Sequence, residues 1–167
     1  MADDASPNGL STLIDDTLID SVCAAAAASA RRRKNHNFHR DNAQPGHRLL
    51  NALQSDSYIP PHRHLDPNKD ETMVVVRGLM GLIEFDDAGT VLRAVKVGAG
   101  GTAIGVDIPF GSWHTVVALT DNTVFLEAKA GPYEILTDAE RATWAPAEDH
   151  PSAAGYLAQL RQHFAVR

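Results

Sequence analysis

Four side chains in this sequence have the types and spacing of a metal site. His62 and His64 are one residue apart in "PPHRHLDPNKDETMVVVRG", and Glu71 follows after six intervening residues, at the start of an apolar run. His114 comes later, in "IPFGSWHT", directly after a Pro-x-Gly turn. Because alternate residues of a strand face the same side, we expect His62 and His64 to aim their imidazoles into one interior.

Three neutral imidazoles and one carboxylate form a common ligand set for divalent transition metals. They suit Fe, Mn, Ni, Co and Zn alike. Such a set leaves one or two coordination positions open, where chemistry is possible. A single histidine of this kind is more often a surface or hydrogen-bonded residue, but the combination predicts a metal site. Asp66 and Asp70 stand close to Glu71 in the chain and are alternative carboxylate ligands.

Further polar residues are candidates for a pocket around the metal. Glu127 and Lys129 share one face of the predicted strand "TVFLEAKAGPY", where they form either an exposed pair or interior groups that bind substrate or move protons. We take Glu127 and His39 as candidate catalytic residues. Arg48 could reach an anionic substrate or pair with a carboxylate, and Tyr133 could orient a ligand or only pack its ring.

The stretch "RRRKNHNFHR" is a candidate phosphate-binding patch. Arginine and lysine pair with phosphate oxygens, and asparagine can hydrogen-bond sugar hydroxyls. For Arg31 and Arg32 the simpler interpretation is a solvated helix end stabilised by the helix dipole. Asn35, Asn37 and His39 alternate as in a strand, and they are candidates for the pocket; Asn35 and Asn37 are taken as substrate-binding residues.

The elements that must position these residues follow from apolar periodicity and turn chemistry. Residues 1–9 are expected to form a loose tail, and 10–34 a helix with an apolar stripe of period 3.6. Residues 35–136 contain short, β-branched apolar runs separated by turns such as "DDAG" and "GAGG", which indicates an antiparallel barrel or sandwich. Residues 137–167 are predicted to be a helical segment of the same domain.

Composition narrows the class of protein. A chain of 167 residues with a net charge of -6 most simply forms one domain, and that charge argues against nucleic-acid or anionic-membrane partners. Its one cysteine excludes an internal disulfide. No stretch approaches the roughly 18 apolar residues of a membrane span, and no secretory signal is recognisable, so a soluble cytoplasmic protein is expected.

Two blocks of the sequence resemble the motifs of the cupin superfamily. The first motif is carried by His62, His64, Glu71 and Gly78, and the second by Pro109, Gly111 and His114. The interval of six residues between His64 and Glu71 departs from the three or four of the general pattern, whereas the interval from Glu71 to Gly78 fits. The resemblance implies an all-β cupin barrel (a double-stranded β-helix or jelly roll), here with an N-terminal helix and short C-terminal helices.

A longer pattern is similar to the WbuC-type cupin-fold metalloproteins. It comprises "NHNFH", "HRLLNALQSDSYIPPHRH", "FDDAG", "WHTVVAL", "EAKAGPY" and "WAPAE", and it runs from about Arg33 to Glu148. The resemblance implies a role in the assembly of O-antigen or other surface polysaccharide, but no established reaction. It also favours a homodimer and a small-molecule ligand, either a sugar or a sugar nucleotide.

Three functions are compatible with these residues. The first is a metal-dependent enzyme, such as an isomerase, epimerase or oxygenase, acting on a carbohydrate or sugar-nucleotide intermediate. The second is a metal-containing module that binds a sugar or anion without turnover. The third is a cupin with a purely structural metal, although a closed zinc site usually has more cysteine ligands.

Overall fold

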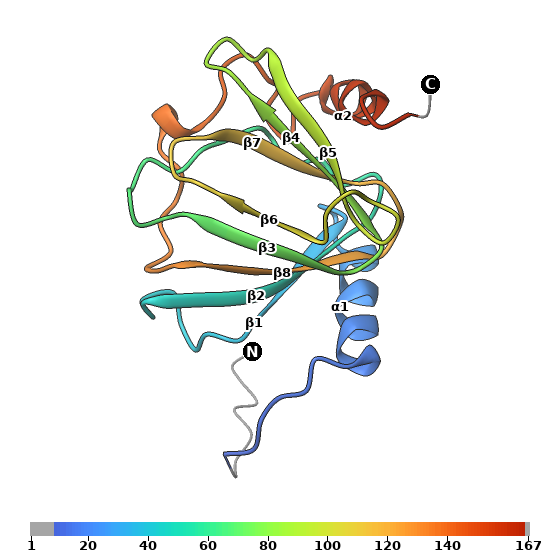
Figure 1. The fold of residues 1–167 in the computed structure, drawn as a ribbon, viewed down its shortest axis with the longest axis vertical. Coiled ribbons are helices and arrows are strands. Elements are labelled where there is room, and N and C mark those ends of the chain that lie inside the picture. Colours follow the sequence, from blue (N-terminus) through green and yellow to red (C-terminus); the bar gives the residue numbers. More distant parts are fainter. Residues whose placement is uncertain (1–8, 166–167) are drawn as a thin grey trace.

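The computed structural model describes residues 9–165 (Figure 1). The expected tail, apart from Gly9, lies outside this range. Helix α1 (Asp16–Ala28) comes first, and the chain closes with the short 3-10 helix η1 (Asp138–Glu140) and helix α2 (Ala153–Gln162). Between them lie the strands β1 (Arg33–Asn37), β2 (Gly46–Leu53), β3 (Glu71–Arg77), β4 (Leu79–Phe85), β5 (Val91–Gly98), β6 (Gly105–Ile108), β7 (Trp113–Ala118) and β8 (Thr123–Ala130).

The strands form two antiparallel sheets that enclose one apolar core. The larger sheet has the order β1-β2-β8-β3-β6, and the smaller has the order β5-β4-β7. Met73 and Phe125 of the larger sheet pack in one buried cluster with Met80, Leu82 and Val116 of the smaller. This arrangement confirms the predicted all-β cupin barrel with an N-terminal helix.

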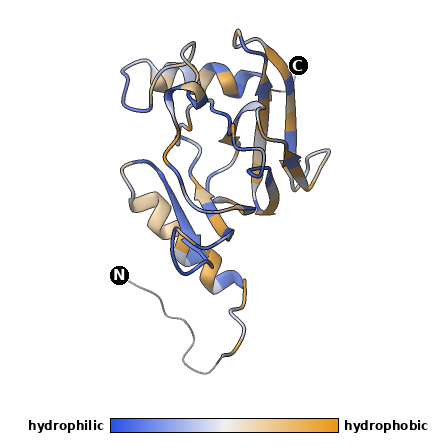
Figure 2. Cartoon of the chain, turned by 90° about the vertical axis from the view of Figure 1, so that its left-hand side faces the viewer, coloured by the Kyte–Doolittle hydropathy of each residue, from blue (hydrophilic) through white to orange (hydrophobic). Residues whose placement is uncertain are grey.

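Helix α1 packs on the outer face of the larger sheet, mainly against β1 and β2 (Figures 1 and 2). Asp15 caps its first turn by accepting a hydrogen bond from the Leu18 N–H at 3.0 Å. Its buried side chains pack on Leu50, Ala52 and Val124; they are Ile19, Val22, Cys23 and Ala26. The buried face therefore keeps Val22 of the predicted apolar stripe, whereas Leu13 and Ile14 precede the helix and are exposed.

The expectation of a helix over residues 10–34 was wrong at both ends. Residues 10–15 precede α1 without regular structure, and residues 33–37 form strand β1. Arg32 turns the chain with a φ of 55°, and β1 then pairs with β2 from Arg33↔Leu53 to Asn37↔Leu49. Pairing with a partner strand thus overrides the local helix propensity of the arginine run.

The C-terminal segment packs on the outer face of the smaller sheet. Leu157 and Leu160 of α2 join a buried cluster with Phe85 and Trp113. Trp144 packs on Phe85, with 4.8 Å between the ring centroids. Residues 137–165 are therefore mainly a packed loop with two short helices. No helix in the described part of the chain is long and apolar enough to cross a membrane.

Gly78 links the two sheets at the end of β3. Its φ of 77° is in the left-handed region, and a Cβ there would lie 3.0 Å from the Thr123 backbone. Glycine is required for both reasons. The turn sends β4 into the smaller sheet, which gives the barrel its second wall.

Candidate metal site

Backbone bridges bring the two histidine blocks together. His62 and His114 exchange N–H···O hydrogen bonds of 3.0 and 2.9 Å, and the Gly111 N–H donates to the His64 carbonyl at 2.6 Å. His62 and His64 lie in the segment between β2 and β3, outside the named strands. The expectation that they share a strand was therefore wrong, and these bridges orient them instead.

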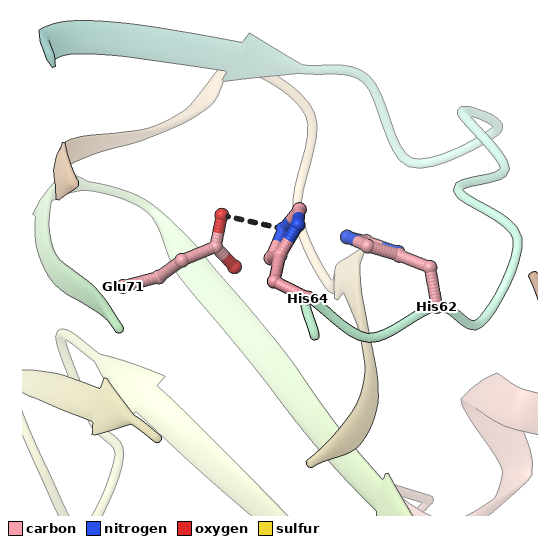
Figure 3. A group of neighbouring side chains, drawn as sticks. All are labelled: His62, His64 and Glu71. Carbon is pink, nitrogen blue, oxygen red and sulfur yellow. Dashed lines mark ion pairs between the residues drawn. The ribbon is translucent and has the colours of Figure 1, made fainter. Parts of the chain in front are cut away.

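The side chains of the predicted ligands converge in the barrel. Ligand atoms of His62, His64 and Glu71 all lie within 4.8 Å of one another (Figure 3). Glu71 opens β3; one of its carboxylate oxygens lies 3.1 Å from His64 Nε2 and the other lies 3.1 Å from His114 Nε2. With metal–ligand bonds of about 2.1 Å, neighbouring ligand atoms lie about 3.0–3.4 Å apart. The two distances of 3.1 Å from Glu71 to His64 and His114 therefore fit a bound ion.

Hydrogen bonds at Nδ1 fix the orientation of two imidazoles. His62 Nδ1 lies 3.0 Å from the Pro60 carbonyl oxygen, and His114 Nδ1 lies 3.0 Å from the Ser112 carbonyl oxygen. Because a carbonyl oxygen can only accept, Nδ1 must carry the proton in each ring. In the neutral ring Nε2 then has a lone pair for a metal, with the backbone carbonyl as its supporting partner.

Several buried polar atoms at this point have no hydrogen-bond partner in the described chain. They are His64 Nε2, His114 Nε2 and Glu71 Oε2. With the proton on Nδ1, His114 Nε2 and Glu71 Oε2 present lone pairs to each other at 3.1 Å, which is repulsive unless a cation or proton lies between them. The residues present therefore fit a bound cation.

The protonation states suit ligation. Burial, and then the neighbouring His114, lower the pKa of His62 to about 3. Burial acts to raise the pKa of Glu71, but His114, His64 and Lys129 hold it well below its ordinary value. Burial opposes protonation of His114, yet the Glu71 carboxylate outweighs it and raises the pKa. The Glu71 carboxylate therefore favours positive charge at this point, whether a proton or a bound cation carries it.

The side chains of Glu127 and Lys129 point into the barrel interior. They are therefore interior groups and not an exposed pair. Lys129 Nζ lies 2.9 Å from Glu71 Oε1 and 2.6 Å from Glu127 Oε1. Asn51 Nδ2 donates to the other Glu127 oxygen at 2.7 Å. Burial, and the charge of Glu71 in addition, raise the pKa of Glu127, although Lys129 opposes the shift. Burial would lower the pKa of Lys129, but Glu127 and Glu71 raise it.

These groups line a cavity of about 120 Å³. Its polar wall consists of His62, Glu71, His114, Glu127, Lys129, Asn51 and Arg33. Its apolar wall consists of Leu53, Ile59, Met73, Val116 and Phe125. We refer to it below as the metal cavity.

The structure does not bring five predicted pocket residues to the metal cavity. Asn35 and Asn37 are exposed on the edge strand β1 and hydrogen-bond each other at 2.7 Å. His39 stacks on another buried histidine, with its Nδ1 3.2 Å from the Arg48 carbonyl oxygen. The Arg48 side chain is exposed, and Tyr133 is 57% exposed beyond the end of β8. Alternation along a strand predicts which face of the sheet a side chain points to, but not how far that residue lies from the barrel centre.

Three contributions to the site were missed. Asn51 holds Glu127, and a lone polar residue within the apolar run "HRLLNALQ" was a signal for it. Arg33 lines the metal cavity, whereas the arginine run had been assigned to a helix end. Glu140 supports the ligand segment by accepting from the Leu65 N–H at 2.9 Å, and no local pattern predicts that contact.

The fold and the site together define a cupin with a candidate metal centre. The chain belongs to the family described as "Domain of unknown function (DUF6016)", whose model matches residues 14–97. This family assignment does not confirm the resemblance to WbuC-type proteins. A comparison with curated proteins gives no match.

The chain resembles several solved structures, one of which is described as an RmlC-like cupin. KdgF from Halomonas sp. is 13% identical, with a TM-score of 0.48, over 64% of this chain and 85% of that one. An RmlC-like cupin from Desulfovibrio desulfuricans is 17% identical, with a TM-score of 0.42, over 60% and 82%. Oxalate decarboxylase from Lactobacillus farciminis is 21% identical, with a TM-score of 0.45, over 60% of this chain and only 29% of that one. We base the fold on the sheet topology and assign no function from these distant similarities.

Proposed function

We propose that this protein is a metal-dependent cupin enzyme that acts on a carbohydrate or sugar-nucleotide intermediate of surface-polysaccharide (O-antigen) synthesis. The observation that carries the metal assignment is the convergence of imidazole and carboxylate lone pairs in a buried pocket. The resemblance of the sequence to WbuC-type cupins supports the substrate class. An isomerisation, an epimerisation and an oxygenation are all compatible with this site.

The metal would be held by His62, His64, Glu71 and His114. When bound, a divalent ion would polarise a carbonyl or hydroxyl oxygen of the substrate. Glu71 is already ionised and His62 neutral, so both are ready to bind it. The apolar wall of the cavity lowers the local dielectric constant, which strengthens the electrostatic interactions there.

The chain's own polar groups would orient the substrate and move protons. Lys129, held between two carboxylates, can donate to a substrate oxygen. Glu127 has one oxygen fixed by Asn51 and the other beside Lys129, and burial raises its pKa, which favours a carboxyl group that can both take up and release a proton. Glu127 is therefore the proposed acid/base, and Lys129 is the proposed substrate-binding group.

Metal analysis tests the ligand assignment. Purified protein is expected to contain stoichiometric transition metal, and His62→Ala and His114→Ala are expected to lose most of it. His163→Ala replaces an exposed histidine at the end of α2 and is the control. Unchanged metal content in both site variants would rule out the proposed ligands.

Catalysis is tested by incubating the metal-loaded protein with a panel of nucleotide sugars and following both product formation and oxygen uptake. Turnover by the native protein and its loss in Glu127→Gln, with metal retained, would support the enzyme. Tight sugar binding without product or oxygen consumption would instead support the alternative, a non-catalytic sugar- or anion-binding module.

A further inference from the structure

A second cavity lies against the metal cavity, on the side of the C-terminal segment. It has a volume of about 310 Å³, compared with about 120 Å³ for the metal cavity. Its walls come from the turn before β1, the ligand segment and the stretch around η1. Arg33, Ile59 and His62 line both cavities. A molecule in the second cavity would therefore end beside a metal ligand.

The polar wall of this second cavity is basic. It contains Arg31, Arg33 and Arg141 but only one carboxylate, Glu148. Arg33 is fixed by Glu148 Oε2 at 2.9 Å and by the Tyr58 carbonyl oxygen at 3.0 Å. Arg31 Nε donates to the other Glu148 oxygen at 2.9 Å. Three guanidinium groups against one carboxylate leave two positive charges unbalanced.

Arg141 is the cation best able to contact a ligand. Within residues 9–165 it forms no ion pair, and its one side-chain hydrogen bond goes to the Leu136 carbonyl oxygen at 3.0 Å. Its backbone is fixed, since Arg141 forms a β-bridge with His62. Most of its guanidinium donors remain available for a planar, multidentate contact with an anion.

The remaining wall is apolar and relatively rigid. It includes Pro60, Pro61, Leu136, Ala142 and Pro146. Such a surface suits a ring or carbon skeleton rather than a second charged group. Two unbalanced positive charges match a phosphate monoester dianion, or the two charges of a sugar-linked diphosphate. The cavity therefore combines an anion-binding side with an apolar side.

We propose that the second cavity binds the phosphate end of a phosphorylated substrate whose other end reaches the metal. This inference rests on the proposed function, because it makes the two cavities parts of one substrate site. It gives the arginine run at the start of β1 a role in phosphate binding through Arg31 and Arg33. Arg141, from the C-terminal segment, supplies the third guanidinium group of this phosphate site.

The test is calorimetric titration of metal-loaded protein with inorganic phosphate and with pyrophosphate. Arg141→Gln is expected to raise the Kd for both anions about tenfold, because it removes charged hydrogen bonds. Arg40→Gln removes an exposed arginine from the β1–β2 loop and should leave the Kd unchanged. Glu148→Gln adds one unbalanced positive charge and should tighten binding several-fold. Equal Kd values for Arg141→Gln and Arg40→Gln would overturn the inference.

Two further arms separate the sources of failure. Phosphate binding that is lost after treatment with EDTA but is unchanged in Arg141→Gln would place the anion on the metal. That result would overturn the assignment of the second cavity but not the proposed function. Binding that persists without metal and is lost in Arg141→Gln supports the cavity, even if metal analysis refutes the proposed function. Acetate at matched ionic strength should not displace pyrophosphate. Displacement by acetate as strong as displacement by phosphate would overturn the choice of phosphate as the ligand.

Discussion

Lys129 is the cation that contacts both carboxylates of the metal cavity. It lies between the buried Glu71 and Glu127, and without it these two carboxylates lose their shared ion pair. Removing one member of such a buried ion pair typically costs about 3–5 kcal/mol. We expect Lys129→Met to lower the free energy of unfolding of metal-free protein by about 3 kcal/mol, measured by urea denaturation.

The same variant should be less destabilised when metal is bound, because the ion supplies the missing positive charge. Lys34→Met, an exposed position on β1, is the control and should have little effect in either state. If Lys129→Met lowers the free energy of unfolding equally with and without metal, Lys129 does not act through the charge of this site.

Individual site residues were predictable where a motif fixes both type and spacing. His62, His64, Glu71 and His114 were identified in this way, and the structure brings them together. Asp66 and Asp70 are instead used in the loop, where they accept hydrogen bonds from the Asn68 and Phe110 N–H groups respectively. Those two contacts depend on turn geometry, which residue type and proximity in the chain do not specify.

At the scale of elements, the segment around η1 supports the ligand segment. The Arg63 N–H donates to the Glu140 carbonyl at 3.0 Å, and the Leu65 N–H donates to a Glu140 carboxylate oxygen at 2.9 Å. The other Glu140 oxygen accepts from the Thr137 N–H at 2.9 Å and so caps the turn. These bonds explain why a segment without regular structure can hold the two candidate ligands His62 and His64 in place.

We expect Glu140→Gln to lower the free energy of unfolding by about 1 kcal/mol at pH 7, because glutamine has one acceptor oxygen instead of two. Burial opposes ionisation, but these hydrogen bonds lower the pKa of Glu140 from 4.5 to about 2. A depressed carboxyl pKa stabilises the fold above the unfolded-state pKa, and that contribution is lost as the pH falls from about 4.5 towards 2. The difference between metal-free native protein and the variant should therefore narrow at pH 3.

Urea denaturation at both pH values measures this difference. Asp138→Asn is the control in the same turn, since the Asp138 side chain makes no hydrogen bond within the described residues. A difference that is the same at pH 7 and pH 3 would show that the Glu140 charge does not hold the ligand segment.

Elements were predictable where the apolar pattern was regular and less so at their ends. The strands around the two cupin motifs were found because alternation and turn residues coincide there. The first two residues of strand β1, Arg33 and Lys34, were expected to end the helix because the sequence "RKNHN" has no apolar alternation, whereas Asn35 and Asn37 were expected to alternate as in a strand. Its strand structure comes from backbone pairing with β2, which side-chain patterns do not encode.

At the scale of the whole molecule, the candidate metal ligands come from three separate parts of the chain. His62 and His64 lie between β2 and β3, Glu71 begins β3 in the larger sheet, and His114 lies on β7 in the smaller. An ion at this point therefore connects the two sheets. The unfolded chain holds these ligands far apart, so metal should bind the native state much more tightly than the unfolded state.

This linkage predicts that thermal stability depends on metal concentration. At a free metal concentration 100 times the Kd, selective binding to the native state adds about 2.7 kcal/mol. For a chain of this length that corresponds to an increase in Tm of about 5–10 °C. Tm should rise with the logarithm of metal concentration in native protein and in His163→Ala, but not in His114→Ala. A Tm of the native protein that does not respond to added metal would exclude the site as a link between the sheets, because the two sheets would then be held together by the apolar core alone.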